Sequence, residues 1–135
     1  AIELGQLSSV AVICRTISAR NKFKRLLENT NACFVIIDKY LTNVTYDNGI
    51  FLTTFHASKG LEFDHVFVVN FQDGYLPHQY ALQSESRRQV EEERRLAYVA
   101  VTRARQGLTI SWSGHPSRFL KNILPVRLKK MYDIR

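Results

Sequence analysis

Short apolar runs recur along the chain and are separated by polar or amphipathic stretches. The runs are rich in β-branched and aromatic residues, which is typical of strands that are buried on both faces of a sheet. Five such strands are predicted: Val10–Cys14, Cys33–Ile37, Ile50–Phe55, Val66–Val69 and Leu108–Trp112.

The first helix is predicted between the first two strands. Phe23, Leu26 and Leu27 recur at helical spacing through about Asn29, and Ser18 is the expected cap. Residues 38–49 are rich in Asn, Asp and Gly and predict a loop.

The clearest helix is predicted from about Ser86 to Arg105. It begins with glutamates and ends with arginines, the order that suits the helix dipole, and Gly107 is the expected stop. A last short helix is expected to open at Pro116-Ser117. Its apolar stripe is Phe119, Leu120 and Ile123.

Strands that alternate with helices predict an α/β fold in which helices flank both faces of a mainly parallel sheet. The 135 residues are enough for one such domain, here expected at 9–123, after a lead-in at 1–8 and before a basic tail at 124–135. Ligands of parallel sheets bind outside the carboxyl ends of the strands. Chemistry is therefore expected just after Cys14, Phe55 and Asn70.

The net charge of the chain indicates which class of partner it binds. The formal net charge is +7 and the sequence pI is about 9.7, which favours a polyanion such as nucleic acid, although a merely basic surface fits equally well. Cys14 and Cys33 each lie in an apolar run and are predicted to be buried, reduced thiols without a metal.

No apolar run approaches the roughly 20 residues of a membrane span, and no signal peptide is visible. A cytoplasmic protein without a membrane partner is expected. Because the chain begins at Ala1, a piece of a larger protein is also expected.

Polar residues concentrate where the third strand ends, in the stretch TTFHASKGLEF. His56, Lys59 and Glu62 are three residues apart and would share one side of a first helical turn. A helix N-terminus beside Lys59 suits a phosphate, of a nucleotide or of a nucleic-acid backbone, and Gly60 would allow a close approach. Glu62 could accept hydrogen bonds from ribose hydroxyls. The alternative is an ordinary solvated turn.

The long helix carries a second cluster. Leu96, Val99 and Arg103 fall at i, i+3 and i+7, so Arg103 is expected to continue an apolar stripe and to need an anionic partner. An arginine finger on a phosphoryl group fits this position. A helix-end arginine that reaches water or a structural carboxylate fits slightly better on spacing alone. Arg94, Arg95 and the run Glu91–Glu93 are interpreted as a charged face.

The 135 residues contain no GxxxxGK[ST] phosphate loop. Asp38 and Asp73 are weak candidates for a Mg²⁺ site, and no metal site is predicted. The chain has residues that could sense a γ-phosphate but none that would hold a whole triphosphate.

The two clusters resemble motifs of the UvrD/Rep-type superfamily 1 helicases. TTFHASKGLEFDHVFVVNFQDGYLP resembles motif V with its following strand and loop, EEERRLAYVAVTRARQGLTIS resembles motif VI, and PSRFLKNI resembles the ending of the domain. The resemblance is strong over about 50–123 and weaker over 9–30. It implies the C-terminal RecA-like domain of such a helicase, a three-layer fold, in a compact variant without the inserted subdomain.

The resemblance also implies roles. Arg103 would be the catalytic arginine at the γ-phosphate, and Gly60 and Glu62 would lie with it at the ATP. Thr54, His56 and Lys59 would meet the phosphates of single-stranded DNA. Arg95 would hold the motif VI helix in place, and Tyr98 would serve packing.

ATP and Mg²⁺ would be bound mainly by an N-terminal RecA-like domain that these residues lack, so this chain alone is expected to be inactive. Two alternatives stay open at this point. One is a nucleic-acid-binding module without an ATPase partner, and the other is a degenerate domain that holds a protein partner.

Overall fold

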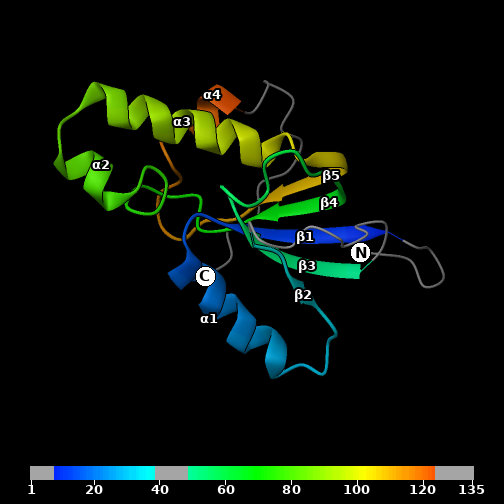
Figure 1. Ribbon diagram of the computed structural model, residues 1–135. Coiled ribbons are helices and arrows are strands. Elements are labelled where there is room, and N and C mark those ends of the chain that lie inside the picture. Colours follow the sequence, from blue (N-terminus) through cyan, green and yellow to red (C-terminus); the bar gives the residue numbers. More distant parts are fainter. Residues whose placement is uncertain (1–7, 39–48, 124–135) are drawn as a thin grey trace.

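A computed structural model describes residues 8–38 and 49–123 (Figure 1). Its strands are β1 (Ser9–Cys14), β2 (Val35–Ile36), β3 (Gly49–Thr54), β4 (Phe63–Val68) and β5 (Ala104–Ile110). Its helices are α1 (Ile17–Glu28), α2 (Gln79–Gln83), α3 (Arg87–Val101) and α4 (Leu120–Ile123).

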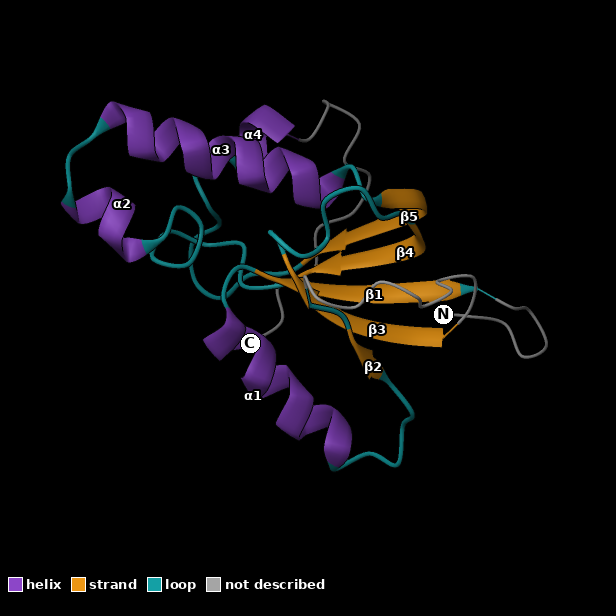
Figure 2. Cartoon of the chain, in the orientation of Figure 1, coloured by secondary structure: helices purple, strands orange, loops and turns teal. Residues whose placement is uncertain are grey.

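The five strands form one sheet in the order β2-β3-β1-β4-β5, and every neighbouring pair is parallel. Helix α1 lies on one side of the sheet, and α3 and α4 lie on the other, which gives three layers (Figures 1 and 2). The predicted α/β class is therefore confirmed. All five strands run in the same direction. We call the side of the sheet at which β1 and β3 end the carboxyl edge, and the side at which β4 and β5 begin the amino edge.

Two apolar clusters hold the layers together. The larger one joins the sheet to α3 and the C-terminal segment, and four fully buried phenylalanines belong to it: Phe55, Phe63, Phe71 and Phe119. The smaller one joins α1 to the other face through Cys14, Ala19, Leu52 and Val69. Removing a side chain of this size from water contributes about 1.5–3 kcal/mol, so the α3 side is the main source of stability.

Helix α1 begins two residues earlier than predicted. Thr16, and not Ser18, is its cap, because the Thr16 hydroxyl accepts a hydrogen bond from the main-chain N–H of Ala19 at 3.1 Å. Helix α2 was not predicted at all.

Helix α3 is shorter than predicted. It begins after Ser86, as expected, but it ends at Val101, and the chain re-enters the sheet at Ala104. The Thr102 hydroxyl donates to the carbonyls of Tyr98 and Val99, which completes the last turn. The prediction of helix as far as Arg105 was therefore wrong, and so was the expected order of charges, because the first turn of α3 holds no acidic residue and its last turn no basic one.

Gly107 does not stop a helix, because it lies within β5, opposite His65 of β4. A Cβ atom at position 107 would come 2.6 Å from the Nδ1 atom of His65. The His65 ring occupies the place of a side chain there, and this close approach explains a glycine in the middle of a strand.

The remaining predictions have mixed outcomes. Cys14 is buried as predicted, but Cys33 is exposed, because β2 is only two residues long and begins after it. Phe119 and Leu120 are buried, as their stripe predicted. Most of the predicted loop at 38–49, the lead-in, the basic tail and the side chain of Ile123 lie outside the described residues. No helix among the described residues has the length and apolar character that a membrane span requires.

Candidate functional site

The connection between β3 and β4 crosses the α3 side of the sheet in eight residues, 55–62. It contains turns and no helix, so the predicted helical turn of His56, Lys59 and Glu62 is wrong. Phe55 and Leu61 anchor its two ends in the larger apolar cluster. Between them the buried Ser58 donates its hydroxyl to the Phe55 carbonyl at 2.8 Å. The connection therefore begins at the carboxyl edge and ends at the amino edge.

A cavity of about 440 Å³ opens at the carboxyl edge, where this connection begins. Thr54 and His56 line it, as the prediction of chemistry after the third strand requires. Two cations that were not among the predicted site residues join them, Arg15 and Arg20. The full lining is Arg15, Thr16, Ile17, Arg20, Asp38, Thr54, His56 and Ala57. Lys59 does not line the cavity.

The cavity carries charges of both signs, because Arg15 and Arg20 line it together with Asp38. Partial burial, then the charges of Arg15 and Lys59, hold the pKa of His56 below its ordinary value, and Glu93 opposes them. The imidazole is therefore neutral at pH 7 and can donate one hydrogen bond. The buried Thr54 hydroxyl accepts from the main-chain N–H of Ala57 at 3.2 Å, and no described residue accepts its own proton.

Glu93 of α3 is buried, with 5% of its surface exposed, and pairs with Arg15. The interpretation of Glu91–Glu93 as one charged face was therefore wrong for Glu93. The sequence carried a signal for this, because Glu93, Ala97 and Ala100 fall at i, i+4 and i+7, and all three are buried. Arg15 carried one too, since it follows the first strand directly.

Arg103 lies at the other end of α3, in the turn before β5. Its main-chain carbonyl accepts from the N–H of Phe63, the first residue of β4, so it belongs to the amino edge. Arg103 therefore lies at the opposite end of the strands from the carboxyl edge, where chemistry was expected. The helical stripe was also misplaced, because Ala97, Ala100 and Val101 form the buried face of α3.

Within residues 8–38 and 49–123, the guanidinium of Arg103 binds neutral acceptors and no carboxylate. Nε donates to the Val99 carbonyl at 2.9 Å, and Nη1 donates to the Leu61 carbonyl at 3.1 Å. Nη2 donates to the Thr102 hydroxyl at 3.2 Å. Three of its five N–H groups are thus used, and its charge is not neutralised by any described residue.

The end of the 55–62 connection lies beside this guanidinium. Gly60 and Glu62 flank Leu61, the residue that Arg103 holds, so the structure brings together the three residues predicted for ATP. Gly60 has a φ of +79° and open space where a Cβ would lie. Its backbone conformation, and not crowding, is what requires glycine here. Glu62 is exposed.

Other predicted residues on α3 lie away from this cluster. Tyr98 is 62% exposed, so it does not pack into the core of the described residues, contrary to the expectation. Arg95 is also exposed. Arg94 is the arginine that packs, with its guanidinium 5.2 Å from the centre of the Phe119 ring.

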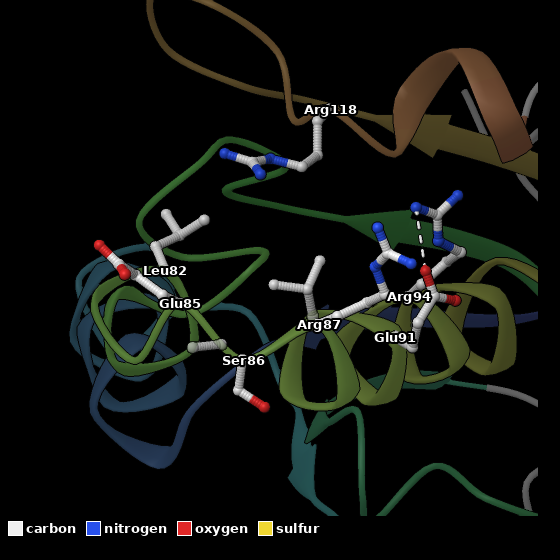
Figure 3. A pocket seen from close by; sticks show the side chains of 9 residues that line it. Leu82, Glu85, Ser86, Arg87, Glu91, Arg94 and Arg118 are labelled. Atoms are coloured by element: carbon white, nitrogen blue, oxygen red, sulfur yellow. Dashed lines mark ion pairs between the residues drawn. The ribbon is translucent and has the colours of Figure 1, made fainter.

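A second cavity, of about 520 Å³, lies between α2, the start of α3 and Arg118 (Figure 3). It contains none of the predicted site residues. Its charges are of both signs, and two of its arginines are already paired: Arg94 with Glu91, and Arg118 with Asp73. Despite its size, we give it no role in the site.

No group of three or more His, Cys, Asp or Glu side chains in residues 8–38 and 49–123 is arranged to hold a metal ion. Asp73, a weak candidate for Mg²⁺, binds the Arg118 guanidinium with both carboxylate oxygens.

Comparison with known proteins gives consistent results. Residues 3–115 match the family of the UvrD-like helicase C-terminal domain. The chain is 31% identical over 130 residues to the probable DNA helicase II homolog of Rickettsia felis, which covers 88% of this chain and 19% of that protein. It is 45% identical over 87 residues to the ATP-dependent DNA helicase PcrA of Staphylococcus epidermidis, covering 56% of this chain and 12% of that one.

The ATP-dependent DNA helicase UvrD2 of Mycobacterium tuberculosis is 48% identical over 88 residues, covering 57% of this chain and 13% of that protein. The chain thus spans about a fifth or less of the length of these curated relatives. Among solved structures, the C-terminal domain of a possible DNA helicase from Lactobacillus plantarum WCFS1 matches with a TM-score of 0.62 at 23% identity. That match covers 87% of this chain and 63% of the other, and it concerns the fold alone.

Proposed function

The chain belongs to the UvrD-like helicase C-terminal domain family, and from this premise we propose that it is the C-terminal motor domain of an ATP-dependent DNA helicase. In this role the amino edge completes an ATP site, and the carboxyl edge grips single-stranded DNA. An N-terminal RecA-like domain supplies the phosphate loop and the Mg²⁺ ligands.

The nucleotide side of the proposal rests on Arg103. Carbonyl and hydroxyl acceptors hold its guanidinium in place without cancelling its charge. A γ-phosphate is a stronger acceptor than any of them, because it is ionised. As an arginine finger, Arg103 stabilises the charge that develops on the transferred phosphoryl group. Glu62 accepts from the sugar hydroxyls, and Gly60 sets the turn between them.

The DNA side rests on the cavity at the carboxyl edge. Arg15, Arg20 and the neutral His56 supply hydrogen-bond donors to phosphate oxygens, and Thr54 supplies a hydroxyl. Lys59, exposed on the same connection, adds a further charge. Contacts of this kind position a strand by its backbone and carry no sequence information.

One observation carries the proposal. The 55–62 connection begins in the carboxyl-edge cavity and ends at the carbonyl that holds Arg103. DNA and nucleotide therefore meet the two ends of a single short segment. A movement of the chain at one ligand is passed along residues 55–62 to the other ligand, as a motor that couples hydrolysis to movement requires.

The nucleotide role is tested by Arg103→Ala in the full-length polypeptide. We expect the DNA-stimulated ATPase rate to fall by about 10³-fold or more, with the affinity for single-stranded DNA unchanged. Arg88→Ala is the matched control, because the Arg88 side chain is 89% exposed and pairs with Glu92 on the same helix. A near-normal rate for Arg103→Ala would exclude the arginine finger.

The DNA role is tested by Lys59→Ala. We expect weaker binding to a single-stranded oligonucleotide and a shallower dependence of log affinity on log salt, by about 0.7 for each phosphate that the variant no longer neutralises. The exposed Lys121 gives the control variant, Lys121→Ala. Equal salt slopes for both variants and the unmodified protein would remove Lys59 from the binding surface.

A second candidate function is a nucleic-acid-binding module without ATPase activity, since the carboxyl-edge cavity needs no nucleotide to bind a strand. Intact DNA binding combined with an Arg103→Ala variant of normal activity would favour this candidate. In either case the 135 residues alone are expected to hydrolyse no ATP, because they contain no phosphate loop.

A further inference from the structure

Glu93 is the only buried charged residue in the described part of the chain. One carboxylate oxygen accepts from Arg15 Nε at 3.0 Å and from the main-chain N–H of His78 at 2.6 Å. The other accepts from Arg15 Nη2 at 2.5 Å and from Nε at 3.1 Å. The carboxylate thus ties α3 to the end of β1 and to the loop before α2.

Stability alone does not explain this arrangement. A buried ion pair gains little over apolar side chains of similar volume, because both charges lose their hydration. Apolar packing would join α3 to the end of β1 as well. The pair therefore calls for a role that needs the guanidinium itself.

The guanidinium is occupied on one side only. Glu93 takes the Nε and Nη2 nitrogens, and Nη1 has no hydrogen-bond partner among the described residues. Nη1 is not a buried atom either, so it is open to solvent. Arg15 lines the same cavity as Thr54 and His56. Its free side is therefore available to a ligand in that cavity.

We infer that Glu93 is a positioning residue for single-stranded DNA: it holds the Arg15 guanidinium so that the free Nη1 side meets a backbone phosphate in the carboxyl-edge cavity. This inference rests on the proposed function. Glu93 itself touches no DNA and acts only through Arg15. A guanidinium fixed on one side loses less freedom when a phosphate binds the other side.

Charge and position predict opposite effects here. Glu93 brings a negative charge close to the proposed phosphate, so on charge alone its neutralisation would strengthen DNA binding. If Glu93 positions Arg15, its neutralisation weakens binding instead. A Gln side chain keeps one oxygen, which can accept from the His78 N–H. Arg15 then meets either the NH₂ group of the amide or a single neutral oxygen in place of two charged ones.

The experiment uses the full-length polypeptide and a fluorescent oligo-dT strand, with Kd measured over a series of salt concentrations. Glu93→Gln is expected to weaken binding about tenfold, in the range of a hydrogen bond to a charged group, and to lower the salt slope by about 0.7. The control is Glu92→Gln, the same change on the exposed side of α3. It is expected to leave Kd unchanged or slightly tighter.

A double-mutant cycle separates positioning from a structural role. In the Arg15→Gln background, Glu93→Gln is expected to have no further effect on Kd or on the salt slope. Equal weakening in both backgrounds would show that Glu93 does not act through Arg15. Tighter binding by Glu93→Gln in the unmodified background would overturn the inference directly.

Two further outcomes distinguish the inference from its premise. If the unmodified protein binds DNA and the Arg15→Gln variant binds it equally well, the role of Glu93 is refuted but the proposed DNA function is not. Absence of binding by the unmodified, folded protein would refute the proposed DNA function. If Glu93→Gln does not fold, as judged by circular dichroism, Glu93→Asp takes its place in the same cycle, because it keeps the charge but shortens the reach.

Discussion

The pairing of Gly107 with His65 gives a quantitative prediction. Gly107 has an ordinary strand conformation, so alanine is sterically possible for its backbone. The obstacle is the His65 ring. An added Cβ would lie 2.6 Å from Nδ1 and 3.3 Å from Cε1, whereas ordinary contacts begin near 3.4 Å. The Gly107→Ala substitution therefore forces the ring from its position.

Overpacking of this kind costs about 1–3 kcal/mol. Alanine also reduces the freedom of the unfolded chain relative to glycine, which returns about 0.4–1 kcal/mol. The net expectation is a loss of about 1–2 kcal/mol in the free energy of unfolding. For a domain of this size the midpoint of thermal unfolding should fall by roughly 4–8 °C. Urea titrations followed by circular dichroism measure the loss directly.

The His65→Ala background tests the reasoning. Without the ring, the added methyl meets nothing close, and Gly107→Ala should be neutral or slightly stabilising there. The coupling energy between the two sites should thus be about 1–3 kcal/mol. An equal penalty in both backgrounds would show that the His65 ring is not why position 107 is a glycine.

Three other predictions concern titration and reactivity. Burial and nearby cations depress the pKa of His56, whereas a bound phosphate favours the charged imidazole. Single-stranded DNA should therefore bind more tightly as pH falls from neutral towards the depressed pKa, and an equally steep pH dependence in His56→Ala would contradict this. The main-chain N–H of Ser9, and then the Arg105 guanidinium, hold the pKa of Asp64 below its ordinary value. Asp64→Asn should therefore lower the free energy of unfolding at pH 7, and the difference should vanish as pH falls through the depressed pKa; urea titrations from pH 7 to pH 2 that keep a constant gap would refute it. Burial raises the pKa of Cys14 to about 12, whereas Cys33 is exposed. A thiol reagent should therefore show one fast phase that Cys33→Ser removes, and fast modification of Cys14 in the folded protein would speak against the burial.

The sequence predicted the sheet better than the ends of its elements. Apolar runs placed all five strands, because burial on both faces leaves a continuous signal. The junction of α3 and β5 was missed because the sequence from Thr102 to Gly107 suits a helix as well as a strand. What decides it is the pairing of Ala104 with Phe63, a contact 41 residues away in the chain.

The site was predicted in part. The concentration of polar residues after the third strand located Thr54 and His56 at the cavity. The pairing of Arg15 with Glu93 joins residues 78 apart, so no local pattern shows it. The position of Arg103 at the amino edge depends on where α3 ends, and that error in the helix carried over to the site.

The eight residues between β3 and β4 have little length to spare. Parallel strands are usually joined by a dozen residues or more, often including a helix. Here the chain must return about 20 Å along β4 and about 10 Å sideways past β1, a straight distance of about 22 Å, while its greatest possible reach is about 30 Å. The turns of residues 55–60 take up the difference, so neither end can shift far unless these turns open or the other end follows. A few glycines and serines inserted beside Ala57 would lengthen this tether and leave the residues at both ends unchanged, which would let the two edges move independently.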